Sequence, residues 1–307
     1  MDTGPWRTWV ALVGAVCCVA AAASACWLQA SFVGWLTAMG VLVILLIVVL
    51  GYDQPGRYLL GPPYTWFVLV AGLVGLASAA RLGRLGWPHV STLAMGGLVV
   101  TLVVLAFVLW GLREPARVQV QRPLVFPLRS GTWVVAAGGM AALNHHLVVG
   151  AQTGALDLIA LRDNGTRAVG TCPRDLGAYA AYRRRVVSPC DGVVTAVVDG
   201  QPETARSRAD AHEPLGNHVR IESASETVCL AHLRPGSVLV AVGEHVVAGQ
   251  SLGEVGRSGR TSEPSLHVHA ERGGVGLRLR FVDVPSGRLR PGVPIRVAER
   301  VQPHVDS

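Results

Sequence analysis

Three long runs without a charged side chain occupy the first third of this chain, and they restrict its fold more than any other feature. They extend over residues 8–52, 58–80 and 85–112. A helix needs about 20 mainly apolar residues to cross the hydrocarbon core of a bilayer. The first run has about twice that length and is interrupted by Gln29-Ala30-Ser31, so it predicts two helices joined by a tight turn. The sequence predicts a helical transmembrane bundle over residues 1–112 with four spans, near 7–28, 32–51, 65–81 and 92–112.

The first span admits a second interpretation. Ala23-Ser24-Ala25 before Cys26 fits the small-x-small site of a cleaved signal peptide. The segment before the span holds only one Asp and one Arg, and another apolar segment follows at once, which favours a retained span. The orientation is also open. The arginines near the span ends place the C-terminal domain in the cytoplasm by the positive-inside rule, whereas long domains translocate regardless of a few charges.

The composition becomes polar after residue 112. Residues 113–142 are expected to form a linker and a first strand, and residues 143–307 a separate domain. This domain contains short runs rich in Val and Ile, each bounded by Gly, Pro, Asp or Ser, among them GVVTAVV, NHVRIES, ETVCLAHL and SLHVHAE. Several short strands with frequent turn signals predict an all-β domain rather than alternating strands and helices.

The net charge of +7 comes from arginine alone, because the chain contains no lysine. The arginines are scattered and lack the clustered basic and aromatic pattern of a nucleic-acid-binding protein, so we expect no nucleic-acid partner. Cys172 and Cys190 do not have zinc-ribbon spacing, and the sequence leaves open whether they form a disulfide.

Histidines are concentrated in the β-rich part of the chain. In a strand, residues two apart point to the same face, so two histidines one residue apart are expected to be neighbours. Imidazole and carboxylate ligands suit zinc. A hydrogen-bonded histidine pair is the commoner case on a strand, so this spacing alone does not establish a metal site. The candidate residues are His145, His146 and Asp157 in LNHHLVVGAQTGALDL, His232 in CLAHLRPGS, and His267 and His269 in PSLHVHAE.

The order of several motifs carries more information than any of them alone. SPCDGVVTAVVDG, GNHVRIES, VCLAHLRPGS and GRSGRTSEPSLHVHAE follow one another with glycine and proline turns between them. In this order they resemble the lysostaphin-type, or LytM-like, zinc metallopeptidases, which cut peptide crosslinks of bacterial cell walls. The resemblance covers about residues 143–285. It implies an antiparallel β domain of the duplicated hybrid-motif kind.

The resemblance implies a zinc site. The family binds the ion through a His and an Asp of its first motif and through the last His of a His-x-His. Asp157 matches the Asp, but Thr153 stands where the usual His partner would be. A subgroup with Asn-x-His followed by Gln fits the NHH segment better, which makes His146 the expected ligand and His145 the fallback. His267 is the expected third ligand.

The resemblance also implies catalytic roles. His232 in LAHL matches the family histidine that orients or deprotonates the attacking water. Ser265 stands where the first His of the His-x-His is expected, so one catalytic histidine is missing. His269 follows the ligand His267 by two residues, and we expect it to substitute partly for the missing catalytic histidine. A shifted register, with His267 and His269 as the pair, is the alternative, and His218 is expected to be structural.

Together these features predict a membrane-anchored zinc metalloendopeptidase that cleaves peptide bonds in peptidoglycan. Its expected partners are peptidoglycan peptide and the lipid bilayer. Because peptidoglycan lies outside the bacterial cytoplasmic membrane, we expect a multi-pass inner-membrane protein with its C-terminal domain outside the cytoplasm. The alternative, which the missing histidine motivates, is a catalytically impaired LytM-like domain that binds cell-wall peptide or activates another hydrolase.

Overall fold

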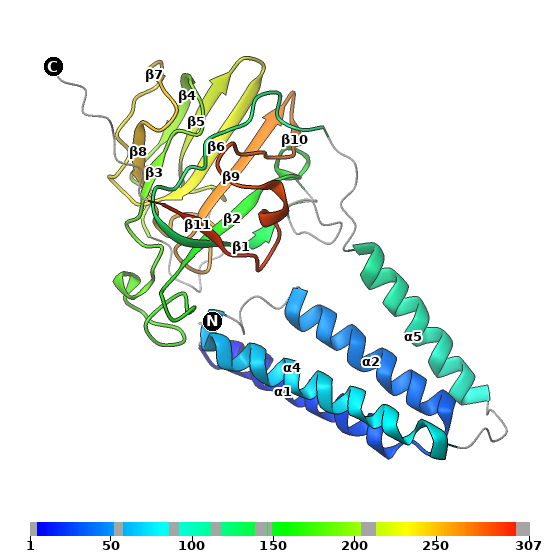
Figure 1. Ribbon diagram of the computed structural model, residues 1–307. Coiled ribbons are helices and arrows are strands. Elements are labelled where there is room, and N and C mark those ends of the chain that lie inside the picture. The colour runs from blue at the N-terminus through cyan, green and yellow to red at the C-terminus, as the bar shows by residue number, and fades with distance from the viewer. Residues whose placement is uncertain are drawn as a thin grey trace. The chain divides into compact units, whose positions relative to one another are not determined.

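The chain divides between residues 113 and 114 into two compact units, one helical and one built from β-strands (Figure 1). The structure is a computed structural model. It describes residues 5–51, 58–85, 92–111, 118–138, 146, 149–203 and 213–298.

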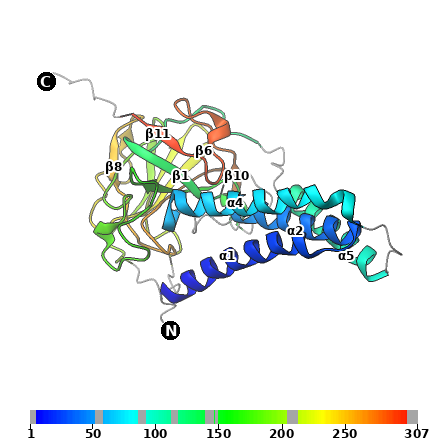
Figure 2. The ribbon, with the colours of Figure 1, turned by 60° about the horizontal axis from the view of Figure 1, so that its bottom comes forward.

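The helical unit consists of apolar helices that pack side by side. Helix α2 contacts α1, α4 and α5, and α1 also contacts α4 (Figure 2). The turn predicted around Gln29-Ala30-Ser31 separates α1 from α2. The helices are α1 (Pro5–Leu28), α2 (Phe32–Gly51), α4 (Pro62–Ala77), which continues as the 3-10 helix η1 (Ser78–Arg84), and α5 (Thr92–Gly111).

Two helical segments in the described part of the chain are long and apolar enough to cross a membrane. They are Phe32–Val49 and Pro62–Arg84. Leu12–Leu28 and Ala94–Trp110 are shorter apolar helices. The predicted helical region is therefore present, and two of its four predicted spans are candidate membrane spans within the described residues.

A side chain from η1 satisfies backbone groups at the end of α1. The Arg81 guanidinium donates to the carbonyl oxygen of Trp27 and, at 3.3 Å, to that of Gln29. The last carbonyl groups of a helix have no partner within the helix. Arg81 therefore supplies donors at the turn between α1 and α2.

The β unit is built around one antiparallel sheet. Its strands run in the order β11-β1-β2-β9-β6-β5-β4-β7, with β10 paired to β9, and β3 and β8 form a separate two-stranded sheet. The strands are β1 (Gly131–Gly138), β2 (Leu156–Leu161), β3 (Arg185–Val187), β4 (Gly192–Val198), β5 (Asn217–Ser223), β6 (Glu226–Leu233), β7 (His245–Val246), β8 (Ser251–Glu254), β9 (Leu266–Arg272), β10 (Val275–Leu277) and β11 (Ile295–Val297). Short 3-10 turns η3 (Gly150–Gln152), η4 (Leu176–Ala178) and η5 (Ser286–Arg288) lie between them.

The centre of the sheet brings together segments that are far apart in sequence. β9 pairs with β2 on one side and with β6 on the other, and β6 pairs with β5 (Figure 1). Asp157 is in register with His267, and His267 is in register with Ala231. This pairing places Asp157 of β2 beside His267 of β9.

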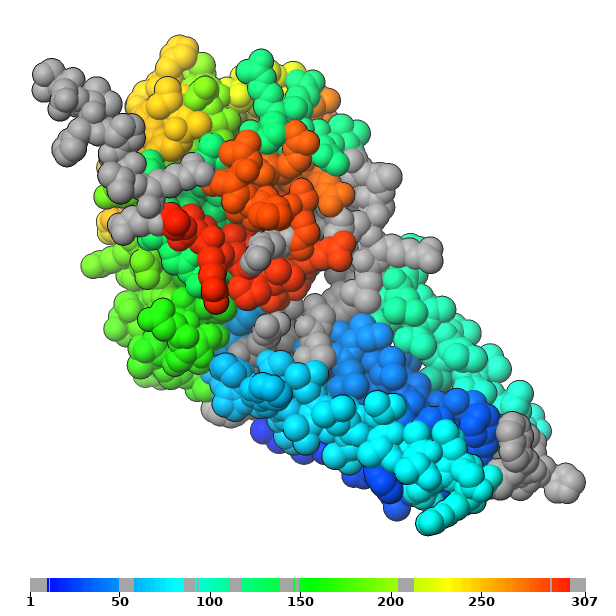
Figure 3. Space-filling model, viewed as in Figure 1, coloured from blue at the N-terminus to red at the C-terminus, as the bar shows by residue number. Residues whose placement is uncertain are grey.

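The apolar side chains of the central strands form the main core. Leu158, Leu230, Leu266 and Val268 are fully buried there. They occupy alternate positions of their strands, as expected when one face of a strand packs on a core. Figure 3 shows the segment that follows β10, in orange and red, on the side of the β unit that faces the viewer.

The first described segment of the β unit is attached along its length. Gln119 forms a bridge with Arg278, Leu124 with Phe281, and the backbone N–H of Gln121 donates to the Glu226 carboxylate at 3.0 Å. The stretch before β1 is therefore part of the β unit.

Candidate metal centre

Strand β9 has one apolar face and one face lined by polar side chains. Leu266, Val268 and Ala270 point into the core, and all three are fully buried. The alternate positions hold His267 and His269, which are exposed by only 2% and 1%. Both imidazoles are thus held inside the protein, where an unpaired polar group is costly.

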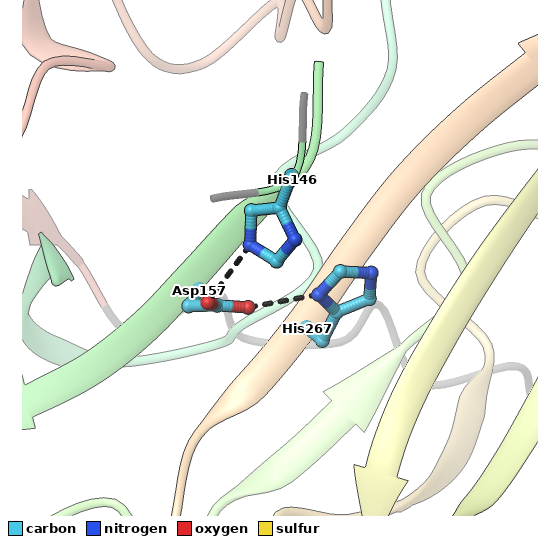
Figure 4. Close-up of side chains that lie close together, drawn as sticks. All are labelled: His146, Asp157 and His267. Carbon is cyan, nitrogen blue, oxygen red and sulfur yellow. Dashed lines mark hydrogen bonds and ion pairs between the residues drawn. The ribbon is translucent and has the colours of Figure 1, made fainter. Parts of the chain in front are cut away.

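Asp157 joins this face from the neighbouring strand β2. Its Oδ1 accepts a hydrogen bond from Nδ1 of His267 at 2.8 Å, and its Oδ2 accepts one from Nε2 of His146 at 2.9 Å (Figure 4). His146 precedes β2 in the chain, and its ring centroid lies 5.0 Å from that of His267. The structure therefore brings together the three residues that the sequence offers as metal ligands.

The charge state of Asp157 follows from these contacts. Burial raises the pKa of its carboxyl, but hydrogen bonds and positive charge from His146 and His267 outweigh burial and hold that pKa well below its usual range. The carboxylate is therefore negatively charged, as a metal ligand must be.

The donor set fits zinc. One ligand atom from each of His146, Asp157 and His267 lies within 4.8 Å of the others. Two imidazole nitrogens and one carboxylate oxygen form a ligand set found in catalytic zinc sites, where three protein ligands leave a fourth position open.

His232 lies beside this cluster at the end of β6. Its ring centroid is 5.8 Å from that of His267, and its Nδ1 donates to the carbonyl oxygen of Ser258 at 2.8 Å. Since a carbonyl only accepts, Nδ1 carries the hydrogen, and Nε2 of the neutral ring is the basic nitrogen. Burial, followed by the positive charge of His267, lowers the pKa of His232 to about 4.

The backbone of His232 adopts an unusual conformation. Its φ is +66°, in the left-handed region that side chains other than Gly, Asn, Asp and His seldom adopt. Its N–H donates to Leu215 O, and its carbonyl accepts from the N–H of Gly256, both at 3.0 Å. Such strained residues persist when the surrounding structure determines them, and they are frequent at functional sites.

The support of His232 comes from the Gly-x-Ser-Gly segment. Ser258 Oγ accepts from the N–H of Asn217 at 2.9 Å and donates to Leu233 O at 2.7 Å. A side chain on Gly216 or Gly259 would overlap the backbone of the other turn. Two turns distant in sequence are therefore packed tightly around the Ser258 carbonyl group. Sequence reasoning identified this motif but missed the contact, because a backbone carbonyl has no side-chain signature.

Two further predicted site residues take positions that the sequence does not specify. His269 Nδ1 lies 3.0 Å from Nε2 of His267, and burial, followed by the charge of His267, lowers the pKa of His269 to about 2. Ser265 is 5% exposed, and its hydroxyl lies 3.0 Å from that of Thr261. The Ser265 hydroxyl thus has a partner outside the three-residue cluster.

Two other histidines of the described residues take no direct part in the cluster. His218 Nδ1 donates to Gly216 O at 2.8 Å, which is a structural contact. His245 lies exposed on β7. The fallback ligand His145 lies outside the described residues. Cys172 and Cys190, whose pairing the sequence leaves open, are free thiols in this structure.

Part of the β unit matches a known family. Residues 176–278 match the model of peptidase family M23. This chain contains an M23 peptidase domain. The matched segment includes His232, His267 and His269, whereas His146 and Asp157 precede it. Peptidases of this family are generally zinc endopeptidases that hydrolyse peptidoglycan.

Solved structures similar to the M23 domain come from several bacteria. A zinc-containing peptidase from Vibrio cholerae is 19% identical, with a TM-score of 0.30, and the match covers 56% of this chain and 41% of that one. The catalytic domain of the prophage-encoded M23 protein EnpA from Enterococcus faecalis is 19% identical (TM-score 0.29; 52% of this chain, 92% of that one). The lysostaphin catalytic domain from Staphylococcus simulans is 16% identical (TM-score 0.27; 45% of this chain, 77% of that one). A search of curated protein sequences gave no match.

Proposed function

We propose that this protein is a membrane-anchored zinc metalloendopeptidase that cleaves peptide bonds in peptidoglycan. The observation that carries the proposal is the cluster of His146, Asp157 and His267 with the His232 ring beside it. The M23 match over residues 176–278 supports the same activity.

Each residue of the cluster has a defined task in this proposal. His146, Asp157 and His267 would hold the zinc ion. When bound, zinc acts as a Lewis acid that activates water and polarises a carbonyl group. His232 is neutral, with Nδ1–H fixed by Ser258 O, so its Nε2 accepts the proton of the attacking water and returns it to the leaving amine.

Ser265 limits the expected rate. Its hydroxyl is paired with Thr261, and a hydroxyl is a poor substitute for an imidazole in proton transfer. Loss of one general acid or base costs about 10² to 10⁴ in rate. We therefore expect a slow peptidase with an intact metal centre.

Digestion of purified peptidoglycan by the full chain in detergent tests the activity. Zinc-loaded wild-type protein is expected to release soluble muropeptides, and a chelator is expected to abolish the release. His232→Asn keeps a residue that tolerates a positive φ and should lower the rate by about 10² to 10⁴. Equal release by wild type, His232→Asn and chelated protein would refute the proposal.

The alternative is a domain that keeps the zinc but has lost most of its activity, and that binds cell-wall peptide or activates another hydrolase. The serine at position 265, where the family has a catalytic histidine, favours this alternative. Ser265→His distinguishes the two functions, because it restores an imidazole at this position. Digestion by wild type supports the enzyme. Digestion by Ser265→His alone supports the impaired domain.

The proposed location is the bacterial inner membrane, with the M23 domain outside the cytoplasm. The apolar helices support the anchor, and the position of peptidoglycan supports the orientation. Val282 is 64% exposed, so Val282→Cys adds an accessible thiol to a background in which Cys17, Cys18, Cys172 and Cys190 are replaced by serine. A membrane-impermeant reagent should label it in intact cells, and labelling only after lysis would contradict this orientation.

A further inference from the structure

The His267 ring lies between Asp157 and His269 and contacts each of them through a different ring nitrogen. Nδ1 of His267 lies 2.8 Å from Asp157 Oδ1, and its Nε2 lies 3.0 Å from Nδ1 of His269. The two ring centroids are 5.2 Å apart. Thus the nitrogen of His267 that faces the candidate ligand cluster is Nδ1, and the nitrogen that faces His269 is Nε2.

The hydrogen positions follow from the chemistry of imidazole. A neutral imidazole carries one hydrogen, so a ring that binds a metal through Nδ1 carries its hydrogen on Nε2. Metal-binding histidines almost always donate this second N–H to an acceptor, which fixes the tautomer and the orientation of the ring. At His267 the neighbouring atom in that position is Nδ1 of His269.

The surroundings of His269 hold its ring in place. It is 1% exposed, and in the strand register it stands opposite Cys229 of β6, which is fully buried. Farther along the same face, Arg220 of β5 forms an ion pair with Glu271 of β9 at 2.8 Å. A ring that is enclosed in this way has little freedom to approach a substrate.

We propose that His269 is a positioning residue of the metal centre. When the ion takes the place of the hydrogen that Nδ1 of His267 shares with Asp157, the His267 hydrogen lies on Nε2, and Nδ1 of His269 accepts it, which keeps Nδ1 of His267 unprotonated and directed at the ion. The role rests on the proposed function, in which His267 is a zinc ligand. It differs from the catalytic role that the sequence suggests for His269, because the ring acts on the ligand and not on the substrate.

Two substitutions separate an acceptor from a space-filling group. His269→Asn keeps an oxygen acceptor attached to Cγ, at about the place where the ring carries Nδ1. His269→Leu keeps an apolar volume and removes the acceptor. Cys229→Ala is the matched control, because it changes the opposite buried residue of β6 and leaves the hydrogen bond intact.

The experiment measures zinc affinity of the full chain in detergent by competition with a chromogenic chelator, together with the visible spectrum of the cobalt-substituted protein. His269→Leu is expected to weaken zinc binding by about 10- to 100-fold and to shift the cobalt bands. His269→Asn and Cys229→Ala are expected to stay close to wild type in both. Thermal unfolding of the metal-free proteins identifies a variant that has failed to fold.

The outcomes are distinct. Equal affinity in wild type and His269→Leu, or equal losses in His269→Leu and His269→Asn, would overturn the positioning role. Absence of zinc binding by wild type would overturn both this role and the proposed function. Weakened binding in His269→Leu alone, with no digestion of peptidoglycan by wild type, would support the positioning role and refute the peptidase.

Discussion

Different interactions stabilise the two faces of the sheet at β2, β9 and β6. One face consists of aliphatic side chains such as Leu158, Leu230 and Val268, which need only complementary shapes. The other presents Asp157, His267 and His269, which need specific partners because buried polar groups are costly when unpaired. The aliphatic face therefore determines the fold. The polar face depends on its hydrogen-bond partners and has the composition of a metal site.

The largest expected effect is a loss of zinc affinity when the polar face loses the negative charge of Asp157. Asp157→Asn removes the only carboxylate of the three-residue cluster among the described residues. Since loss of a supporting partner already costs 10- to 100-fold in affinity, we expect loss of a ligand to weaken zinc binding by more than about 100-fold. Measurements of bound zinc and of muropeptide release check this. Unchanged zinc content would remove Asp157 from the site.

The next effect concerns stability and comes from the adjacent residue on the other face. Leu158→Ala is expected to lower the free energy of unfolding by about 2–5 kcal/mol, because it leaves a cavity in a fully buried position. Urea unfolding followed by the β-sheet circular dichroism signal measures the change. The folded fraction should still bind zinc in the same ratio as wild type. A loss of zinc from folded Leu158→Ala protein would show that the two faces are coupled.

A third effect is a dependence of stability on pH, which the aliphatic face cannot produce because it has no titratable group. His232 has an ordinary pKa of 6.5, and in the folded protein its pKa is lowered to about 4. Stability is therefore fully present above pH 6.5 and falls as the unfolded chain takes up the proton, by roughly 3 kcal/mol at pH 4.

Metal-free protein unfolded in urea at several pH values between 6.5 and 4 provides the measurement. His232→Asn should reduce the slope by about one proton. His269 contributes in the same direction, so subtraction of the variant from wild type isolates His232. Identical slopes would mean that His232 is protonated at the same pH in the folded and unfolded states.

The smallest effect is expected at the partly exposed end of the polar face. Arg220 and Glu271 form an ion pair at 2.8 Å, but the Arg220 side chain is one third exposed. Ion pairs that reach solvent contribute about 0–1 kcal/mol. Arg220→Gln should change the free energy of unfolding by no more than about this amount and less at high salt. A loss as large as that of Leu158→Ala would make this pair part of the core.

Much of this arrangement was accessible from the sequence. The alternation of Leu266, His267, Val268 and His269 predicts a two-faced strand, because successive residues of a strand point to opposite faces. The turn at Gln29-Ala30-Ser31 separates two helices, because polar residues interrupt an apolar run that is too long for one span.

Other features depend on register and on backbone groups. The pairing of Asp157 with His267 joins residues far apart in the chain, and no local pattern specifies it. The hydrogen bond between His232 and Ser258 uses a carbonyl oxygen that every residue possesses. Of the four predicted membrane spans, the described residues support two, Phe32–Val49 and Pro62–Arg84, as long and apolar enough to cross a membrane.

The close contact between the turns at Gly216 and Gly259 has a consequence for genetics. Both glycines have a positive φ, and a methyl group on either would push the neighbouring turn away. The displaced turns carry Asn217 and Ser258, which support the ring of His232. A screen for temperature-sensitive alleles would therefore be expected to recover alanine at these two positions, although neither residue is among the proposed metal ligands.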